Sequence, residues 1–521
     1  MRTRLWRRLG GMAVWTAAII AAPGSAAAAW LEASSEHFLI YGNVSETWLT
    51  KYSEQLEKLD AGMRYLQKVG ASPGGRSNRL VIYVVPDATA VQRICGKCRD
   101  VAGFYVPRIG GSVAYTPRNS FVQDDGTSFA QIVLQHEYGH HFLLENFAAA
   151  YPRWFSEGFA EFGSTGKLNP DGSYTIGRPA NHRAYSLVLG GNMPMEELLA
   201  PDDGKKVTSE HMDLFYGRAW ALTHMLMFDP AQKGKLSAYL RQLQEGRPAL
   251  DAARNTLGDL KVLGQDLDRY IDQRRLLALT IKADALPTGP VAIRRLSPGE
   301  QAMMDVRMRS DRGVTPEEAA RIVVDARRRA APFPDDAAAQ LALAEAEFDA
   351  DHLDEAEAAA DRAIAADGKS VGGMLYKGQV RIARALADKN ATPETWKEAR
   401  TWFSRANRAD PEAAEPLMRF YQSFVAAGIA PSRNAVAGLA SAFARSPHDE
   451  GLRMMHAVQL LNDDNKDEAR SVLAAIAFDP HKSGENAASR LLAQLDSGKS
   501  GPEALAAVSD TASSSAAAET D

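Results

Sequence analysis

Residues Ser128 to Phe162 read SFAQIVLQHEYGHHFLLENFAAAYPRWFSEGFAEF, and the region around them is organised by this stretch. Within it, the run from His136 to His140 has the form His-Glu-x-x-His. Residues four apart lie on one face of a helix, so the rings of His136 and His140 can converge on one ion while Glu137 lies beside them. This pattern is typical of the ligand half of a zinc hydrolase site.

Two carboxylates follow in the run Glu-Gly-Phe-Ala-Glu. A catalytic zinc needs three protein ligands and one open position for water, so we expect Glu157 to be the third ligand. Residues 154–162 have helical spacing and could pack against the first helix. Glu161 lies one turn further on and is expected to accept a hydrogen bond from the non-ligating nitrogen of His136 or His140. The alternative, two solvated surface carboxylates, is disfavoured by the aromatic residues Phe155, Phe159 and Phe162 around them.

The histidines are expected on a helix with a defined start. Asp124 to Ser128 supply turn and N-cap residues, and an apolar face follows at Phe129, Ile132 and Val133. Plain core histidines are the alternative, but two of them with an intervening Glu are costly to bury without an ion or partners. His141 lies off the ligand face and is expected to be structural.

Zinc hydrolysis also needs a base and a donor for the developing oxyanion. Glu137 is expected to be the general base, because zinc lowers the pKa of its bound water toward about 7 and a carboxylate can then take the proton. Tyr216, in a predicted helix at residues 216–226, is the expected oxyanion donor, with His224 as the second choice. The alternative for Tyr216 is an ordinary packing residue.

Length and composition set wider limits. A chain of 521 residues is expected to form about two to four domains. Its hydrophobic fraction of 45%, its charged fraction of 24% and its net charge of -5 are ordinary for a globular protein. No basic excess indicates a nucleic acid partner.

Residues 1–29 predict a signal peptide. A basic start is followed by an apolar run at Met12 to Ala22 and by small residues at Ala26 to Ala29. An uncleaved membrane anchor is the alternative, but the apolar run is short for a membrane span. We therefore expect no stable span after cleavage, and a periplasmic or secreted protein.

Cys95 and Cys98 are the two cysteines of the chain. In an exported protein, a small local disulfide is the expected state. The alternatives are a redox Cys-x-x-Cys, which should open a helix in a thioredoxin-like unit, and a structural zinc, which needs two further ligands.

Residues 30–285 are expected to form the catalytic domain. Predicted strands at residues 37–42 and 79–85 flank a helix at residues 47–69, and residues 103–106 and 112–115 predict a hairpin. Strands first and helices later indicate an α+β domain. The strand from Ser112 to Tyr115 is also expected to bind an extended peptide by edge pairing.

Behind a predicted linker at residues 286–315, residues 316–498 become rich in alanine. Apolar residues recur at the spacing of tetratricopeptide repeats, which have a period of about 34 residues. A generic alanine-rich helical bundle is the alternative. Such repeats stack into a solenoid whose concave face suits a peptide or protein partner. Residues 499–521 are rich in Ser, Ala and acids, and we expect disorder there.

The motif residues resemble those of the gluzincin metallopeptidases, the group that includes thermolysin and the zinc aminopeptidases. Their His-Glu-x-x-His is followed by a Glu ligand, which in the aminopeptidases lies in a Trp-Leu-x-Glu-Gly-x-Ala-like stretch. Residues Trp154 to Ala160 match that stretch, so the resemblance assigns the ligand role to Glu157. Thermolysin-like enzymes carry a further carboxylate four residues later, and Glu161 matches it. The resemblance implies a zincin-like α+β fold, Zn²⁺ as the cofactor and a peptide or protein substrate.

A closer resemblance is to a group of exported bacterial gluzincin-like proteins that often carry tetratricopeptide repeats behind the peptidase-like domain. Trp30 and the run Ser35 to Phe38 fit their opening strand. The Gly-x-Met-x-Asn exopeptidase motif of the aminopeptidases is absent. The resulting hypothesis is an exported zinc endopeptidase whose repeats dock a protein partner or substrate. The alternative is a catalytically idle periplasmic scaffold whose repeats bind partner proteins.

Overall fold

The computed structural model describes residues 29–70, 75–96, 98, 101–123, 126–147, 151–200, 208–477 and 485–518. Residues 1–28 of the predicted signal peptide lie outside these ranges, as do Asp124 and Asp125 of the predicted helix start. Across the described ranges, no helix is long and apolar enough to cross a membrane.

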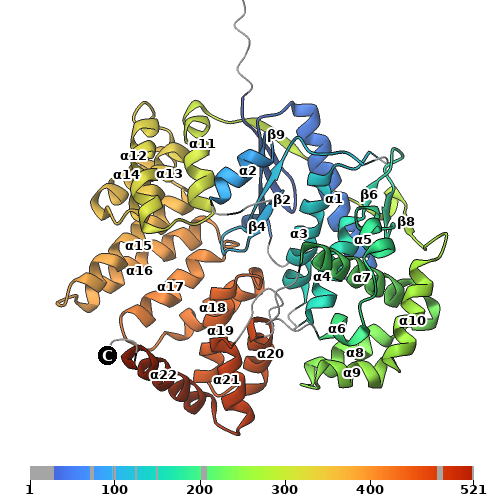
Figure 1. The fold of residues 1–521 in the computed structure, drawn as a ribbon. Helices are drawn as coiled ribbons and strands as arrows, with labels where there is room; N and C mark the ends of the chain where they lie inside the picture. Colours follow the sequence, from blue (N-terminus) through green and yellow to red (C-terminus); the bar gives the residue numbers. More distant parts are fainter. Residues whose placement is uncertain are drawn as a thin grey trace, which may run out of the picture.

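A mixed sheet of six strands forms the centre of the N-terminal part (Figure 1). Its strand order is β4-β5-β3-β2-β1-β9. The neighbouring strands β2, β3 and β5 run parallel, whereas β4, β1 and β9 run antiparallel to their neighbours. The strands span β1 Leu31–Ser34, β2 Phe38–Gly42, β3 Leu80–Val85, β4 Phe104–Val106, β5 Val113–Pro117 and β9 Ala292–Arg295.

Helices cover both faces of this sheet. Successive side chains of a strand point to opposite faces. Ile40 and Ile82 therefore join one core with α1 (Glu46–Gln67) and α3 (Phe129–Asn146), whereas Tyr41 and Tyr83 join another with α2 (Ala88–Cys95) and α11 (Pro298–Asp311). The result is an α/β unit in which helices alternate with strands. The predicted α+β order is wrong here, because parallel strands require crossover connections, which α1 and α2 supply.

The predicted hairpin is confirmed, since β4 pairs antiparallel with β5 and Phe104 lies opposite Tyr115. The expected peptide pairing at Ser112 to Tyr115 is wrong. Strand β5 lies between β4 and β3, so neighbouring strands already use both of its edges. The open edge at this end of the sheet belongs to β4.

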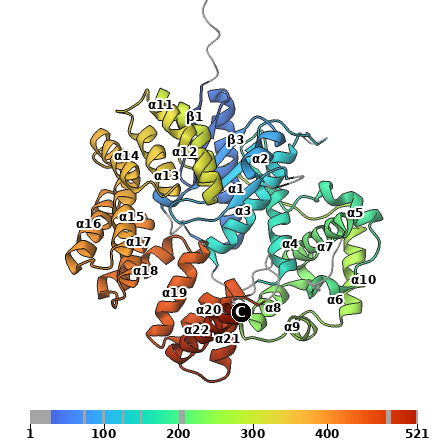
Figure 2. The same ribbon diagram turned by 60° about the vertical axis from the view of Figure 1, so that its left-hand side comes forward.

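A second group of elements follows α3 and lies beside the sheet unit in both ribbon views (Figures 1 and 2). It is mainly helical and includes a small sheet of order β6-β7-β8. The predicted helix at residues 216–226 is confirmed as part of α7. The elements span α4 Arg153–Ser164, β6 Lys167–Leu168, β7 Tyr174–Ile176, α5 Ala184–Leu189, α6 Met195–Leu199, α7 Ser209–Phe228, α8 Lys235–Gln244, α9 Ala249–Thr256, α10 Leu260–Ile271 and β8 Leu279–Ile281.

Residues 286–315 do not form the predicted linker. Strand β9 pairs with β1, and α11 begins with a capping box between Ser297 and Glu300. Met304 and Met308 of α11 are buried against the aromatic side chains of the sheet. This burial of apolar surface explains why the segment is ordered although its Pro and Gly residues suggest a loop.

The C-terminal part is a solenoid-like array of paired helices that begins with α11. Residues predicted from the repeat spacing, including Ala360, Phe403, Ala406 and Leu439, are at most 1% exposed. The further helices span α12 Pro316–Ala330, α13 Ala337–Asp349, α14 Leu353–Ala366, α15 Val371–Ala387, α16 Pro393–Ala409, α17 Glu415–Ala426, α18 Arg433–Arg445, α19 Glu450–Asn462, α20 Lys466–Ala477, α21 Ala487–Asp496 and α22 Gly501–Ala518. The predicted disorder of residues 499–521 is wrong up to Ala518, because α22 packs on α19 and α21.

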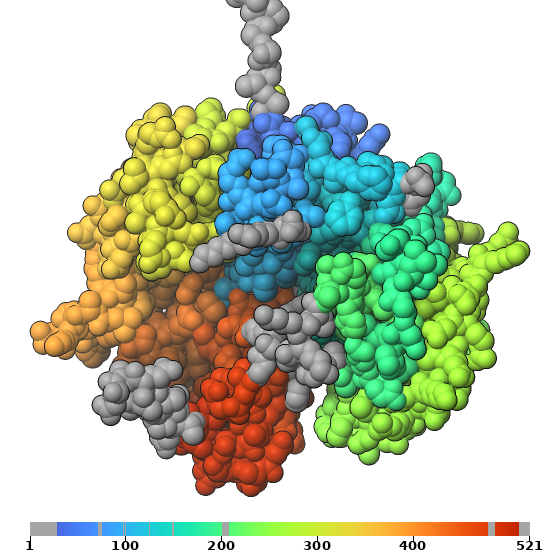
Figure 3. Space-filling model, viewed as in Figure 1, coloured from blue at the N-terminus to red at the C-terminus, as the bar shows by residue number. Residues whose placement is uncertain are grey.

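The array curves around the sheet unit and contacts it again at the β4–β5 loop. In the space-filling view, the array runs from the yellow α12 region to the red α19–α21 region beneath the blue sheet unit (Figure 3). Ile109 packs among residues of α17 and α18, and its N–H donates to Asp449 at 2.8 Å. The ring of His141 on α3 lies 4.8 Å from the ring of His448. The array therefore touches the helix that carries the predicted metal ligands.

The two cysteines form the local disulfide that their spacing favours. Cys95 ends α2, and its sulfur is joined to that of Cys98. In this arrangement neither cysteine is a thiolate ligand, so a structural zinc at this position is not formed.

Gly139 is the point of closest approach between α3 and α4. A Cβ atom added there would lie 2.7 Å from Cα of Ala160. We predict that Gly139→Ala lowers the free energy of unfolding by about 1–3 kcal/mol, because backbone must move to make room. Urea unfolding measures this change.

Gly438→Ala in α18 is the matched control. Its added Cβ would meet Leu417 at 3.5 Å, which is ordinary van der Waals contact. A gain of about 0.5–1 kcal/mol is expected from the better helix propensity of Ala. Equal effects of the two substitutions would contradict the close packing at Gly139.

Candidate metal centre

Helix α4 brings two carboxylates into the protein interior. Every residue from Trp154 to Ser164 is buried, and Glu157 and Glu161 are 0% and 1% exposed. A buried carboxylate is costly unless positive charge or hydrogen-bond donors compensate it. The surroundings of these two side chains must therefore supply that compensation.

Helix α3 supplies the two histidines. Its N-cap Ser128 accepts a hydrogen bond from the N–H of Gln131, as the sequence predicts. Tyr138 and Phe142 fix the helix in the main core. His136 and His140 then face Glu157.

Three possible ligand atoms converge at this point. Nε2 of His136 and Nε2 of His140 are 3.2 Å apart, and each lies 3.4 Å from Oε2 of Glu157. A tetrahedral zinc with ligand distances of about 2.0–2.1 Å separates its ligand atoms by roughly 3.3–3.4 Å. The triangle has the size and the donor types that a zinc ion requires. His136, His140 and Glu157 are, among the described residues, the group of at least three His, Cys, Asp or Glu side chains whose ligand atoms lie close enough together to hold a metal ion.

In the protein without metal, the same contacts shift the pKa values of His136 and Glu157. Burial lowers the pKa of His136, but the carboxylates of Glu157 and Glu161 outweigh this effect and raise it to about 10. Burial raises the pKa of Glu157, and the charges and hydrogen bonds of His140 and His136 bring it well below its usual value. The carboxylate is therefore ionised, as a metal ligand must be.

Glu161 lies behind the ligands and holds His136. Its Oε1 is 3.1 Å from Nδ1 of His136, the ring nitrogen that points away from the three-atom cluster. His182 contacts its other oxygen at 2.7 Å, and Arg183 donates to Oε1 at 2.6 Å. A carboxylate in this position can fix the tautomer and orientation of His136.

Three contacts of the centre are absent from the sequence prediction. His182 and Arg183 follow β7 in a short 3-10 helix, Asn181–Arg183, and Arg183 also pairs with Asp213 of α7. The hydroxyl of Ser156 lies 3.2 Å from Nδ1 of His140. Position 156 lies next to Glu157 in the motif, but nothing in the spacing of His182 or Arg183 indicates that they reach Glu161.

Tyr216 borders the same centre, and Glu137 follows His136 in the chain. Glu137 is half-buried on α3, next to His136. The ring of Tyr216 lies edge-on to the ring of His136, with their centroids 6.0 Å apart, and under the guanidinium of Arg183. Burial and the charge of Glu157 raise the pKa of Tyr216, so its hydroxyl keeps its proton and can donate it in a hydrogen bond.

Two other histidines are structural. His224, the second choice as oxyanion donor, is 0% exposed, and its nitrogens contact the hydroxyl of Tyr270 at 2.7 Å and the carbonyl of Gly177 at 2.8 Å. Both of its nitrogens are therefore occupied away from the centre, and this expectation is wrong. His141 contacts the hydroxyl of Tyr105 at 2.9 Å, as expected of a residue off the ligand face.

Comparisons with known proteins add information on the repeats. No family model matches the chain, and no curated protein matches it. Among solved structures, the chain is similar to a thermophilic TPR (tetratricopeptide repeat) protein of Thermus thermophilus, at 18% identity and a TM-score of 0.29. The match covers 36% of this chain and 91% of that chain. At this TM-score we draw no conclusion from it about partners or activity.

Glu161→Gln should weaken zinc binding by about tenfold to a hundredfold, because the amide cannot hold His136 as an anion does. Competition with a chromophoric chelator measures the zinc affinity. Glu197→Gln is the control, since Glu197 pairs with the half-buried His211 away from the centre. Unchanged affinity in Glu161→Gln would contradict the positioning role of this carboxylate.

Proposed function

We propose that this protein is an exported zinc-dependent peptidase, with His136, His140 and Glu157 as metal ligands and Glu137 as general base. The observation that carries the proposal is the triangle of His136 Nε2, His140 Nε2 and Glu157 Oε2, with sides of 3.2, 3.4 and 3.4 Å. The resemblance of Trp154 to Ala160 to the gluzincin ligand stretch supports the peptide bond as the bond that is cleaved. The absence of the exopeptidase motif favours an endopeptidase.

When bound, a zinc ion at these ligands lowers the pKa of a coordinated water and polarises a substrate carbonyl. The carboxylate of Glu137 accepts the proton of the attacking water and later donates it to the leaving amine nitrogen. Glu161 keeps Nδ1 of His136 engaged, so that Nε2 stays directed at the cluster. Buried α4 excludes water from the opposite side of the ligands.

Tyr216 is proposed as the donor to the developing oxyanion. Its raised pKa keeps the phenol protonated near neutral pH. Arg183 over its ring holds the side chain on the His136 side of α7. A donor in such a position typically contributes about 2.7–4 kcal/mol to catalysis.

A protein scaffold is the second candidate, and the fit of the array to the sheet unit favours it. Ile109 is buried among helices of the array, so the two parts are built to stay together. Solenoid repeats bind peptides or proteins on their concave face, which makes a protein partner a reasonable proposal for either function. In a deletion strain, full rescue by the Glu137→Gln chain would favour the scaffold.

We predict about one zinc per chain and a loss of hydrolysis of about 10²–10⁴-fold in Glu137→Gln. Cleavage of a proteome-derived peptide library gives the rate, and elemental analysis gives the metal content. The variant should keep its zinc and its fold, because Glu137 is not a ligand. Glu54→Gln on the exposed side of α1 is the control and should cleave normally. Absence of zinc after metal-replete purification would refute the proposal.

Tyr216→Phe should lower kcat by about 10²–10³-fold, because one donor to the oxyanion is lost. Its zinc content and melting temperature should stay near those of the unmodified protein. Steady-state kinetics on one peptide from the library would measure the effect. A change in KM alone would assign Tyr216 to substrate binding instead.

A further inference from the structure

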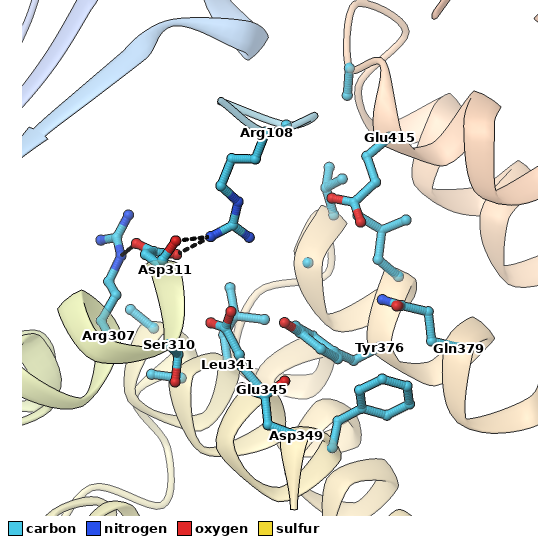
Figure 4. A pocket seen from close by; sticks show the side chains of 18 of the residues that line it. Arg108, Arg307, Ser310, Asp311, Leu341, Glu345, Asp349, Tyr376, Gln379 and Glu415 are labelled. Atoms are coloured by element: carbon cyan, nitrogen blue, oxygen red, sulfur yellow. Dashed lines mark hydrogen bonds and ion pairs between the residues drawn. The ribbon is translucent and has the colours of Figure 1, made fainter. Parts of the chain in front are cut away.

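A large cavity lies between the sheet unit and the inner helices of the array, away from the metal centre. Its volume is about 820 Å³, and it is lined by the β4–β5 loop together with α11, α13, α15 and α17. Figure 4 shows Arg108 reaching in from the loop, with Glu345 and Tyr376 facing it from the array. The described residues that form it thus come from both parts of the chain.

The arginines of the cavity are already paired with acids. Nη1 of Arg108 lies 3.0 Å from Oδ1 of Asp311, and Arg307 is 3.5 Å from the other oxygen of the same carboxylate. At the opposite end, Arg419 pairs with Glu415 at 2.9 Å. Arg108 and Arg307 therefore share one carboxylate, whereas Arg419 has a carboxylate of its own.

Two carboxylates of α13, the half-buried Glu345 and the exposed Asp349, lack such an ion-pair partner, although Glu345 is hydrogen-bonded to Tyr376. Among the residues that the structure describes, no Lys, Arg or His nitrogen forms an ion pair with Glu345 or Asp349. Burial, followed by the charge of Asp311, raises the pKa of Glu345 to about 8 despite the nearby Arg108. Partial desolvation, together with the charge of Asp311, raises the pKa of Asp349 to about 6. A ligand that brings positive charge would compensate both side chains.

The walls next to these carboxylates are apolar. Leu341, Phe348 and Leu375 line the cavity around Glu345. Such walls suit an aliphatic chain, and the carboxylates suit a compact cation at its end. A guanidinium is a poorer fit, because it needs a planar set of acceptors around it.

We propose that this cavity binds a primary alkylammonium group, with Glu345 as the main counter-ion and Asp349 as the second. The group can come from the lysine side chain of a polypeptide or from a small alkylamine, since both present the same aliphatic chain and cation. The site is separate from the metal centre and does not depend on the proposed peptidase activity.

Binding should strengthen as the pH rises from about 6 to about 8. The charged and titratable groups that face Glu345 are Arg108 of the loop, Asp311 of α11, Asp349 of α13, Tyr376 of α15 and Glu415 of α17. Of these, Asp349 also has a pKa raised into the neutral range. The free protein holds protons on Glu345 and Asp349 that a bound cation must displace, so proton release favours binding at higher pH.

Isothermal titration calorimetry on the purified protein tests the proposal with three probes. They are butylammonium, the capped peptide Ala-Lys-Ala, and the same peptide with norleucine in place of lysine. We expect butylammonium, the lysine peptide or both to bind, and the norleucine peptide to bind at least about tenfold more weakly than the lysine peptide. If the lysine peptide binds more tightly than butylammonium, the natural ligand is a polypeptide. If butylammonium binds more tightly, the natural ligand is a small amine.

Glu345→Gln should weaken binding by about tenfold or more, whereas the exposed control Glu355→Gln should bind normally. The Glu345→Gln variant should keep its zinc, and its melting temperature at pH 8 should equal or exceed that of the unmodified protein. The reason is that a raised pKa in the folded state lowers stability as the pH rises toward that pKa. Equal binding of the norleucine peptide, unchanged binding in Glu345→Gln, or no binding of either amine at millimolar concentration would overturn the proposal.

Discussion

Two buried carboxylates on one helix impose the main constraint on this structure. Helix α4 is surrounded by other elements on all sides, yet it carries Glu157 and Glu161. Because ionised carboxylates are costly to bury alone, the fold must direct donors toward them. The histidines of α3 face Glu157, while His182 and Arg183 of the 3-10 helix after β7 hold Glu161. A divalent ion at the three ligand atoms would complete this compensation.

The closeness of α3 and α4 makes that arrangement possible. Gly139 lies between the two histidines in sequence, and its missing side chain lets the backbone of α3 approach Ala160. The same position therefore serves the packing and the ligand geometry. Trp154 and Tyr239 anchor the start of α4, where the indole N–H donates to the phenol oxygen at 3.3 Å. Small residues at the crossing and aromatic residues at the ends set the separation of the ligands.

The helical array is part of the same body as the sheet unit. Its first helix covers one face of the sheet, and its later helices receive Ile109 of the β4–β5 loop. That hairpin also reaches α3, because Tyr105 contacts His141. A displacement of the array would therefore change contacts of the helix that carries the ligands. The cavity around Glu345 lies within this junction, next to the Arg108 and Asp311 pair.

The features that depend on residues close together in the chain could be predicted from the sequence. The spacing of His136, His140 and Glu157, the N-cap at Ser128, the hairpin and the buried positions of the repeats follow from periodicities that each helix or strand imposes on its own residues. These features depend on neighbours in the chain, so a single sequence contains the information for them. The approach of His136, His140 and Glu157 to one another was predictable for the same reason, since two neighbouring helices carry all three residues.

The contacts between residues far apart in the chain were decided only by the tertiary structure. His182 and Arg183 reach Glu161 because of how β7 and α5 are placed, and β5 lies inside the sheet because β4 pairs beside it. The segment at residues 286–315 resembles a loop, but it gains order by pairing with β1 and burying Met304 and Met308. Such contacts join residues far apart in the chain. Their free energy comes from burial against partners that local periodicity does not specify. The sequence therefore determined the candidate ligands, and the fold decided what surrounds them.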